Sequence, residues 1–312
     1  MKEEIRDSFV KTLQEIKKQN EQVVILVSDS SSTCRIKPFF DEYPESVINI
    51  GIAEQNMVGI AAGMSMGGFI PVTANATPFL MGRSNEQVKN DVCYSQTNVK
   101  LVGLNPGFAY GSLGPTHHCL DDISTMLAFG GIEILAPSDP EETKQITQYA
   151  IAKKGPVYIR LDSFVAENIH KENYTFKPGN TVIIREGSDI TLIALGTMVH
   201  EVIAANEELE KQGISAEIIS IPSIRPLDPE GIIKSLKKTG AAITFEEHST
   251  HGGIGSIIGD IILKNQLNCK IKKLGVPAGQ FAEASPRSDI KESYNLHKEG
   301  IIHNVLALLD RR

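Results

Sequence analysis

The sequence lacks the long apolar segment that a membrane-spanning helix needs. No apolar run approaches the roughly 18 residues that cross a bilayer. The longest candidate, MVGIAAGMSMGGF at residues 57–69, is too short and too rich in glycine. The first residues, MKEEIRDSFVKTLQEIKK, are charged and have no apolar core, so we do not expect a signal peptide. Together these absences predict a cytoplasmic protein.

An excess of basic residues is also missing. The chain has 31 Lys and Arg against 38 Asp and Glu, a formal net charge of -7. Non-specific binding to nucleic acid or to an anionic membrane requires a basic face, so this balance argues against both partners. It leaves room for a local basic pocket. The length of 312 residues and the apolar content of 41% are typical of a soluble globular protein with two domains.

Cysteine pairs of the kind found in metal and redox motifs are absent. Cys34, Cys93, Cys119 and Cys269 form no C-x-x-C pair, and their spacing suits no zinc knuckle. We therefore expect buried free thiols in a reducing compartment.

Apolar strands alternate with helices along most of the chain, which predicts α/β domains with three layers each and a parallel sheet in the first. QVVILV, FIPVTA and VKLVGLN read as buried strands, and residues 54–66 and 85–92 read as helices. Ser138 or Asp139 can cap a helix that starts at Pro140. The polar stretch around Pro178 breaks the rhythm. We expect a first domain at 1–165, a linker at 166–187 and a second domain at 188–312.

One stretch places a lone carboxylate beside a long uncharged segment. Residues 51–69 read GIAEQNMVGIAAGMSMGGF, in which Glu54 precedes uncharged residues rich in Gly, Ala and Met. Gly51 allows a tight turn into a helix, and Gly59 and Gly63 share one helix face that another backbone can approach closely. On pattern alone, this can also be a packed core helix whose first Glu complements the helix dipole.

The amino-acid sequence of this stretch resembles the pyrimidine-binding segment of transketolases and 1-deoxyxylulose-5-phosphate synthases, which are thiamine diphosphate enzymes. Further landmarks follow in the family's order: VSDSSS, GPTHH, APSDPEE, GPVYIRL, GTMVHEVIAA, IRPLD, EEHSTHGGIGS and FAEASP. The likeness covers nearly the whole chain and is greatest to the separate C-terminal subunit of a split transketolase. It implies a pyrimidine-binding domain with a parallel sheet, followed by a transketolase C-terminal domain with a mixed sheet.

The resemblance assigns roles to residues of the first domain. Glu54 matches the carboxylate that hydrogen-bonds N1′ of the cofactor's aminopyrimidine and so drives deprotonation of the thiazolium C2. That role implies an apolar pocket, which raises the proton affinity of the carboxyl. Phe79 matches the ring that stacks on the aminopyrimidine, and Asp29 and Ile52 are the other cofactor-binding candidates. Read without the family, Phe79 can be a plain core residue and Asp29 a loop cap.

The loop GSLGPTHH supplies the second catalytic candidate. His117 matches the family's substrate-facing histidine, which can hydrogen-bond substrate oxygens and shuttle protons near neutral pH. A lone loop histidine is more often structural, but the G-P-T-H context is specific. Arg160 and Asn105 are further substrate-binding candidates, and Arg160 can equally be a surface ion pair. We assign His118 no role.

A part of the family's cofactor site is missing from this chain. The G-D-G motif, followed by Asn, which holds metal and diphosphate in the family, does not occur; Gly259-Asp260-Ile261 lacks its context. The resemblance therefore implies an N-terminal, diphosphate-binding partner subunit that supplies the Mg²⁺ ligands, with thiamine diphosphate between the two chains. We expect a homodimer of this chain within a heterotetramer, joined by a large apolar interface.

Several positions also depart from the family pattern. They are Leu113 in place of Asp, Asn105 in place of His or Asp, Ser163 in place of Arg, and Ala76 in place of an aromatic residue. The loss of an arginine removes a bidentate grip on phosphate. We infer a donor or acceptor other than an ordinary phosphorylated ketose, although Arg160, Arg83 or a partner residue could still bind phosphate.

The second domain offers less chemistry. EEHSTHGGIGS leads from a strand into a helix, and a glycine-rich turn there can bind phosphate; alone it is a weak dinucleotide signal. The resemblance implies a mainly structural domain. We assign no catalytic role to Glu246, Glu247, His248 or His251.

The sequence therefore predicts one subunit of a thiamine diphosphate-dependent transketolase that transfers a two-carbon ketol unit from a ketose to an aldose. Two other carboligase subunits stay open: one like 1-deoxyxylulose-5-phosphate synthase, and the beta chain of a 2-oxoacid dehydrogenase, which GPTHH fits poorly. A non-catalytic partner subunit is the alternative of a different class. Glu54 and His117 speak against it, since a scaffold needs no buried carboxylate.

Overall fold

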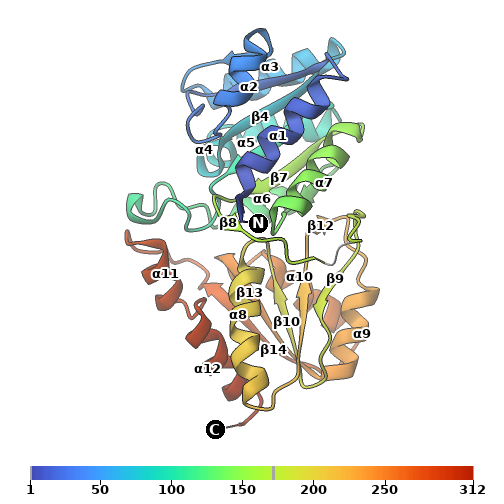
Figure 1. Ribbon diagram of the computed structural model, residues 1–312, viewed down its shortest axis with the longest axis vertical. Coiled ribbons are helices and arrows are strands. Elements are labelled where there is room, and N and C mark those ends of the chain that lie inside the picture. Colours follow the sequence, from blue (N-terminus) through green and yellow to red (C-terminus); the bar gives the residue numbers. More distant parts are fainter. Residues whose placement is uncertain (1, 171–172, 312) are drawn as a thin grey trace. The chain divides into compact units, whose positions relative to one another are not determined.

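The computed structural model describes residues 2–170 and 173–311, which divide into two compact units. The first unit consists of residues 2–106, 125–168 and 174–176, and the second of residues 107–124, 169–170, 173 and 177–311. The segment 107–124, which comes from the middle of the sequence, thus packs with the C-terminal part. Figure 1 shows the course of the chain through its elements, coloured along the sequence.

The first unit is built on a parallel sheet. Its strand order is β6-β7-β5-β4-β2-β3, and every neighbouring pair in that order is parallel. The strands are β2 (Val23–Val27), β3 (Val47–Asn49), β4 (Ile70–Ala76), β5 (Lys100–Leu104), β6 (Glu133–Leu135) and β7 (Val157–Leu161). All residues of β2, β4, β5 and β7 are buried, as expected for a sheet covered on both faces.

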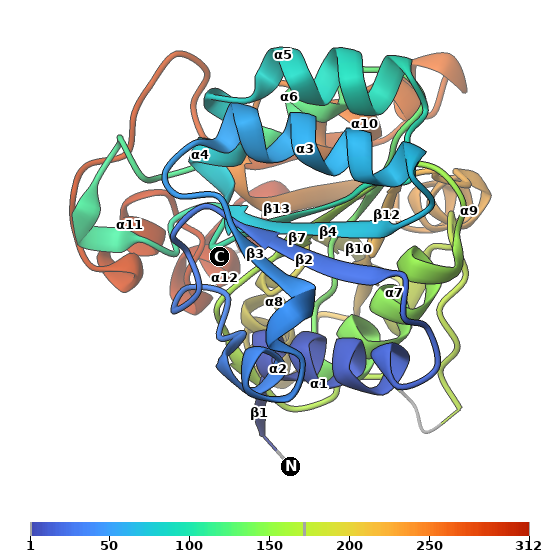
Figure 2. The same cartoon turned by 90° about the horizontal axis from the view of Figure 1, so that it is seen from above.

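Helices cover both faces of this sheet, which gives three layers. In Figure 2, α1, α2 and α7 lie on one face and α3 and α5 on the other. The elements are α1 (Ile5–Lys17), α2 (Lys37–Glu42), η1 (Pro44–Ser46), α3 (Glu54–Met66), α4 (Thr77–Gly82), α5 (Asn85–Gln87), the π-helical η2 (Val88–Tyr94), α7 (Pro140–Ala152) and the part of α6 (Asp122–Ala128) that follows residue 124. A short antiparallel pair joins β1 (Glu3–Glu4) to β8 (Val165–Ala166). The core on the α1 side includes Ile5, Phe9 and Leu13.

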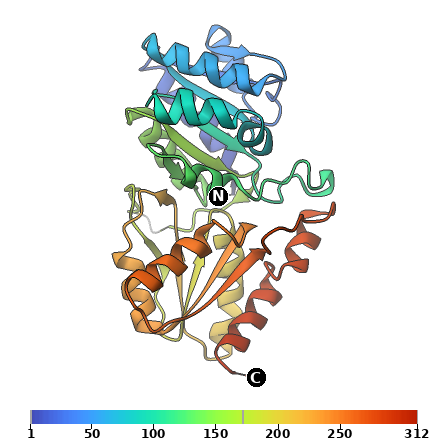
Figure 3. The same ribbon diagram turned by 180° about the vertical axis from the view of Figure 1, so that it is seen from behind.

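The second unit has a mixed sheet with the order β14-β13-β10-β11-β9. Only β9 runs antiparallel, against β11. The elements are η3 (Gly111–Leu113), β9 (Val182–Arg185), β10 (Ile190–Ala194), α8 (Met198–Lys211), β11 (Ala216–Ser220), β12 (Ser223–Arg225), α9 (Glu230–Thr239), β13 (Ala241–Ser249), α10 (Ile254–Lys264), β14 (Lys270–Val276), α11 (Arg287–Ser293) and α12 (Lys298–Leu308). Helices α8 and α12 pack together on one face. Figure 3 shows α10, in orange, in front of the other face.

These sheets confirm the predicted fold class, and most local predictions agree. Helix α3 spans the predicted residues 54–66, and Asp139 caps α7 by accepting a hydrogen bond from the Glu142 N–H at 2.8 Å. The helix predicted at 85–92 is different. Ser95 and Thr97 donate to carbonyls five residues earlier, so this segment widens into a π-helix.

Two further details correct the sequence reading. The stretch predicted as a linker contributes β9 to the second sheet. Cys34, Cys93 and Cys119 are buried free thiols as predicted, whereas Cys269 is only partly buried. Among the described residues, no helix combines the length and the apolar character that crossing a membrane requires.

Candidate active site

The candidate residues of the first unit gather at the carboxyl edge of its parallel sheet, where ligands bind in open α/β sheets. Each follows or ends a different strand: Ser28 and Asp29 follow β2, Glu54 follows β3, Asn75 and Phe79 come from β4 and α4, Asn105 follows β5, and Arg160 lies near the end of β7. The topology therefore collects side chains that the sequence spreads over more than 130 positions.

Glu54 is the first residue of α3, and it is only 2% exposed. Its Oε1 accepts hydrogen bonds from Asn75 Nδ2 at 3.2 Å and from Ser28 Oγ at 3.4 Å. Its Oε2 accepts one from Arg83 Nη1 at 2.8 Å. A charged residue can stay buried here because three side chains satisfy its oxygens.

These contacts correct the expectation of an apolar pocket with raised proton affinity. Burial by itself raises the pKa of Glu54, but hydrogen bonds from Arg83, from its own backbone and from Asn75, together with the charge of Arg83, hold the pKa below its ordinary value. In this chain Glu54 is therefore a carboxylate paired with an arginine.

Arg83 contacts Phe79 as well as Glu54. The Arg83 guanidinium carbon lies 4.5 Å from the centroid of the Phe79 ring, so a flat cation covers that ring. Phe79 is half-buried, and the Arg83 side chain is 48% exposed. A planar N–H donor thus lies over the aromatic ring and donates to the buried carboxylate at the same time.

Asp29 and Ile52 flank this cluster in the chain, next to Ser28 and shortly before Glu54. The backbone of Asp29 has a positive φ of 56°, and its N–H donates to Asn49 Oδ1 at 3.0 Å. Asn49 also accepts from the Gly51 N–H, which fixes the turn before α3. Ile52 is 72% exposed, at the surface of that turn.

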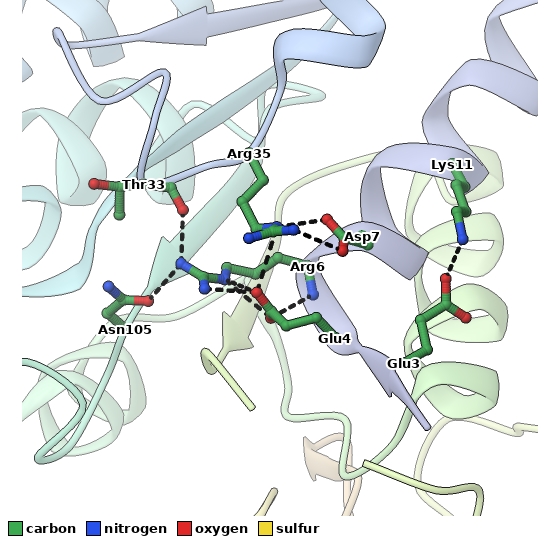
Figure 4. A network of polar contacts seen from close by, with 8 residues as sticks. All are labelled: Glu3, Glu4, Arg6, Asp7, Lys11, Thr33, Arg35 and Asn105. Atoms are coloured by element: carbon green, nitrogen blue, oxygen red, sulfur yellow. Dashed lines mark hydrogen bonds and ion pairs between the residues drawn. The ribbon is translucent and has the colours of Figure 1, made fainter. Parts of the chain in front are cut away.

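Asn105 belongs to a polar network at the same edge of the sheet (Figure 4). Its Oδ1 accepts from Arg6 Nη1 at 3.4 Å, and its backbone has a positive φ of 54°. The same guanidinium donates to the Thr33 carbonyl and pairs with Glu4. Because Glu4 neutralises Arg6, this network holds the Asn105 side chain in place and does not form an open anion site.

Arg160 is buried in β7, next to Gly103 of β5. Of the positions that depart from the family pattern, Ala76 is buried, whereas Leu113 is 57% exposed. Ser163 lies just beyond β7, where its N–H donates to Asp162 Oδ1.

His117 belongs to the second unit and is partly exposed in the loop 107–119. Its Nδ1 lies 2.9 Å from Thr116 Oγ1, and its ring packs edge-on against Tyr110 with 5.6 Å between centroids. The neighbouring His118 is buried, and its Nε2 binds the Gly111 carbonyl at 2.8 Å.

Sequence reasoning missed two partners of Glu54, namely Ser28 and Asn75, and the contact with Arg83. Asn75 carried a usable signal, since it lies near the end of an otherwise largely apolar strand. Within residues 2–170 and 173–311, no group of three or more His, Cys, Asp or Glu side chains is arranged so that it could hold a metal ion.

Two domain families match the chain. Residues 2–163 match "Transketolase, pyrimidine binding domain", and residues 179–301 match "Transketolase, C-terminal domain". The match to the first covers the segment that carries Glu54, Phe79 and His117.

Relatives of similar length support this result. The chain is 44% identical to a subunit of the apulose-4-phosphate transketolase of Actinobacillus succinogenes, over 93% of this chain and 94% of the relative. It is 34% identical to 6-deoxy-6-sulfo-D-fructose transketolase subunit SqwH of a Clostridium species, over 99% and 95%. A solved structure described as a split gene transketolase, inactive beta4 tetramer, superposes with a TM-score of 0.86 at 31% identity and covers 98% of both chains.

Proposed function

This chain belongs to the transketolase family, and on that premise we propose that it is the C-terminal subunit of a split transketolase. The reaction moves a two-carbon ketol unit from a ketose to an aldehyde acceptor. The observation that carries the proposal is the buried Glu54 carboxylate, 2% exposed, which Arg83 links to the half-buried ring of Phe79 at the carboxyl edge of the sheet.

The residues present fit the aminopyrimidine of thiamine diphosphate, the cofactor of this family. Arg83 supports this fit, because its guanidinium already makes two contacts of the kind that such a ring needs: one over the Phe79 ring and an N–H donated to Glu54. When bound, the cofactor supplies the carbanion and the electron sink of the reaction. We infer that Arg83 moves away from Glu54 when the cofactor ring enters.

With the cofactor bound, Glu54 would hold at its Oε2 the proton that it shares with the aminopyrimidine ring. Departure of Arg83 removes the nearest positive charge, so the pKa of the buried Glu54 carboxyl rises and proton sharing becomes easier. Ser28 and Asn75 stay on Oε1 and fix the orientation of the carboxyl group. Asp29 and Ile52 remain candidates for contacts at the rim.

His117 is the proposed substrate-facing residue. Its ring is oriented by Thr116 and Tyr110 and is partly exposed, as a group that exchanges protons with substrate oxygens must be. Asn105 and Arg160 are the further candidates for substrate contacts.

The substrate proposal rests on the departures and on the relatives. Ser163 cannot replace the phosphate grip of an arginine. The relative at 44% identity is named for apulose 4-phosphate, and the relative at 34% for a sulfonated fructose. We propose a modified ketose that carries an anionic group, and apulose 4-phosphate is the first donor to assay.

A second chain completes the proposed enzyme. We propose that an N-terminal transketolase subunit supplies the Mg²⁺ ligands and the diphosphate contacts. Helix α3 offers a face for contact between chains, since a Cβ added at Gly59 or Gly63 would meet nothing within 4 Å and Met66 is 82% exposed. Pairing of two such faces would give a homodimer of this chain in a heterotetramer. A cytoplasmic location stays a prediction of the sequence.

The test uses this chain with its N-terminal partner, Mg²⁺ and thiamine diphosphate. Glu54→Gln should lower kcat by roughly 10²–10⁴, the range typical of a lost acid–base group. Glu142→Gln is the matched control, because Glu142 is also a fully buried glutamate in the first turn of a helix of the same unit. Equal turnover by wild type and Glu54→Gln would refute the catalytic role, and consumption of pyruvate in place of ketose would favour a synthase-like enzyme.

A further inference from the structure

The loop that carries His117 is a closed unit with a defined base. Gly107 and Cys119 exchange backbone hydrogen bonds, with N···O distances of 2.9 and 3.1 Å, and so close the loop at its two ends. Inside it, the His117 and His118 N–H groups both donate to the Gly114 carbonyl. Backbone hydrogen bonds therefore cross-link the loop, so its position depends on the contacts at its base.

Glu247 holds that base. Its side chain is 3% exposed, and its Oε2 accepts the Phe108 N–H at 3.0 Å. Arg287 grips the same carboxylate with two nitrogens, Nε at 3.0 Å from Oε1 and Nη2 at 2.9 Å from Oε2. Lys291 adds a second positive charge at 3.6 Å. Charge-assisted and bidentate hydrogen bonds of this kind fix geometry as well as charge.

Steric contacts at three glycines seat the loop on the same group of residues. A Cβ at Gly107, where φ is +62°, would lie 2.6 Å from the Glu247 Cβ. A Cβ at Gly111 would lie 3.1 Å from the Ser285 carbonyl oxygen, and one at Gly114 would lie 2.8 Å from the Ala284 Cβ. The loop thus follows the surface formed by Glu247 and residues 284–287 closely.

The contacts continue from Phe108 to the catalytic candidate. The Phe108 ring packs edge-on against His118 and stacks on Tyr294, with 5.9 Å between centroids in each case. His118 adjoins His117 in the chain and is fixed by its bond to the Gly111 carbonyl. Two packed rings, those of Phe108 and His118, therefore connect the base of the loop to the chain neighbour of His117.

We propose that Glu247, held by Arg287, is a positioning residue for His117. The inference rests on the proposed function and extends it to the EEH motif, to which the sequence assigns no catalytic role. Glu247 touches no substrate; it sets where the His117 ring stands. Removal of its charge weakens the hydrogen bonds from the Phe108 N–H and from the Arg287 guanidinium, so the loop no longer has a single preferred position.

The neighbouring Glu246 provides a matched control. It is also a fully buried glutamate of β13, and its carboxylate accepts two backbone N–H groups, those of Ile254 and Gly255 at the start of α10. Both of these hydrogen bonds join β13 to α10 and not to the loop 107–119. Replacing Glu246 should therefore disturb the domain to a similar degree without the same effect on the base of the loop.

The experiment compares Glu247→Gln with Glu246→Gln in the full chain and in the complex with the N-terminal subunit. Histidine-selective NMR of the chain alone follows the His117 ring signals, assigned by their loss in His117→Asn. We expect Glu247→Gln to shift and broaden those signals and to lower kcat by on the order of tenfold to a hundredfold, with little change in KM. Glu246→Gln should lower the melting temperature while the His117 signals and kcat per folded enzyme stay near wild type.

A milder variant keeps the test decisive if Glu247→Gln folds poorly. Arg287→Lys retains the positive charge but loses the two-nitrogen grip, so it should give a smaller change of the same kind. Unchanged His117 signals in both variants, or equal changes in Glu247→Gln and Glu246→Gln, would overturn the proposal. If His117→Asn leaves turnover intact, the proposed function of His117 fails, whereas the NMR result still decides whether Glu247 positions the loop.

Discussion

Replacement of Arg83 by methionine isolates the charge that keeps Glu54 ionised. The change removes the guanidinium that donates to Glu54 Oε2 at 2.8 Å and retains an unbranched side chain. Asn75 and Ser28 remain on the other oxygen. The variant therefore leaves a buried carboxylate with two neutral side-chain donors and without its arginine.

The size of the effect follows from burial. Two charges about 4 Å apart attract by roughly 4 kcal/mol at an effective dielectric constant of 20, and by about 1 kcal/mol in water. Glu54 is 2% exposed, but Arg83 is 48% exposed, so solvent screens much of the attraction. We expect Arg83→Met to lower the free energy of unfolding by ~1.5 kcal/mol at pH 7, consistent with the usual worth of a hydrogen bond to a charged group.

The pH dependence gives the prediction its sign. The pKa of Glu54 is lowered in the folded chain, so its stabilising contribution is fully present above the ordinary value of 4.5. The contribution disappears as the pH falls through the lower folded pKa. The difference in unfolding free energy between wild type and Arg83→Met should therefore be largest near pH 7 and should shrink as the pH falls and Glu54 becomes protonated.

Urea unfolding from pH 7 down to about pH 3.5 measures this difference, and Arg35→Met is the matched control. Arg35 is 47% exposed, close to the value for Arg83; its partner Asp7 is 33% exposed, and its second partner Glu4, 3.5 Å away, also pairs with Arg6. Because Arg6 stays on Glu4, loss of Arg35 should cost less than about 1 kcal/mol. The reasoning fails if both variants lose equal stability at pH 7, or if the Arg83→Met deficit persists unchanged at acid pH.

Three further predictions concern substitutions of single residues. Lys100 is buried and donates to Asn98 and to two backbone carbonyls, so Lys100→Met should lower the free energy of unfolding by about 2 kcal/mol. Burial lowers the pKa of Lys100 to about 7. The difference in unfolding free energy between wild type and variant, measured with urea, should therefore grow from pH 7 towards about pH 10. Gly107→Ala should lower the melting temperature more than Gly213→Ala, since both have positive φ but a Cβ at Gly107 would meet Glu247 at 2.6 Å and one at Gly213 would meet nothing within 4 Å. Gly63→Arg should leave the melting temperature of the dissociated chain near wild type and reduce assembly in size-exclusion chromatography.

The fold could be predicted because its signals are local. Buried parallel strands read as apolar runs, and α3 begins at the one charged residue of its stretch, so 54–66 was identifiable without coordinates. The π-helical turn after Val88 was not predictable in this way. A turn bonded over five residues differs from an α-helical one in backbone geometry, and side-chain periodicity does not report that difference over one or two turns.

The candidate site could be predicted as a set of residue types and not as an electrostatic environment. Uncharged residues after Glu54 suggested an apolar pocket, because the chain near it contains no other charge. The cation that pairs with Glu54 comes from position 83, beyond a complete strand and a short helix, and Asn75 comes from the strand between them. Since the pKa of a carboxyl depends on charges that surround it in space, the direction of its shift required the tertiary structure.

The same reasoning explains why the sequence assigned no catalytic role to the second domain. EEHSTHGGIGS contains no residue with an obvious reaction partner, and sequence logic looks for groups that could react. Glu247 acts, in our proposal, through a backbone N–H that lies 139 positions earlier, a contact that leaves no trace in the pattern of either segment. A buried carboxylate is costly unless its oxygens are satisfied, and the groups that satisfy Glu247 are the Arg287 fork and the base of the loop with His117. Domain roles assigned from motifs alone therefore underestimate residues whose chemistry consists of holding another residue still.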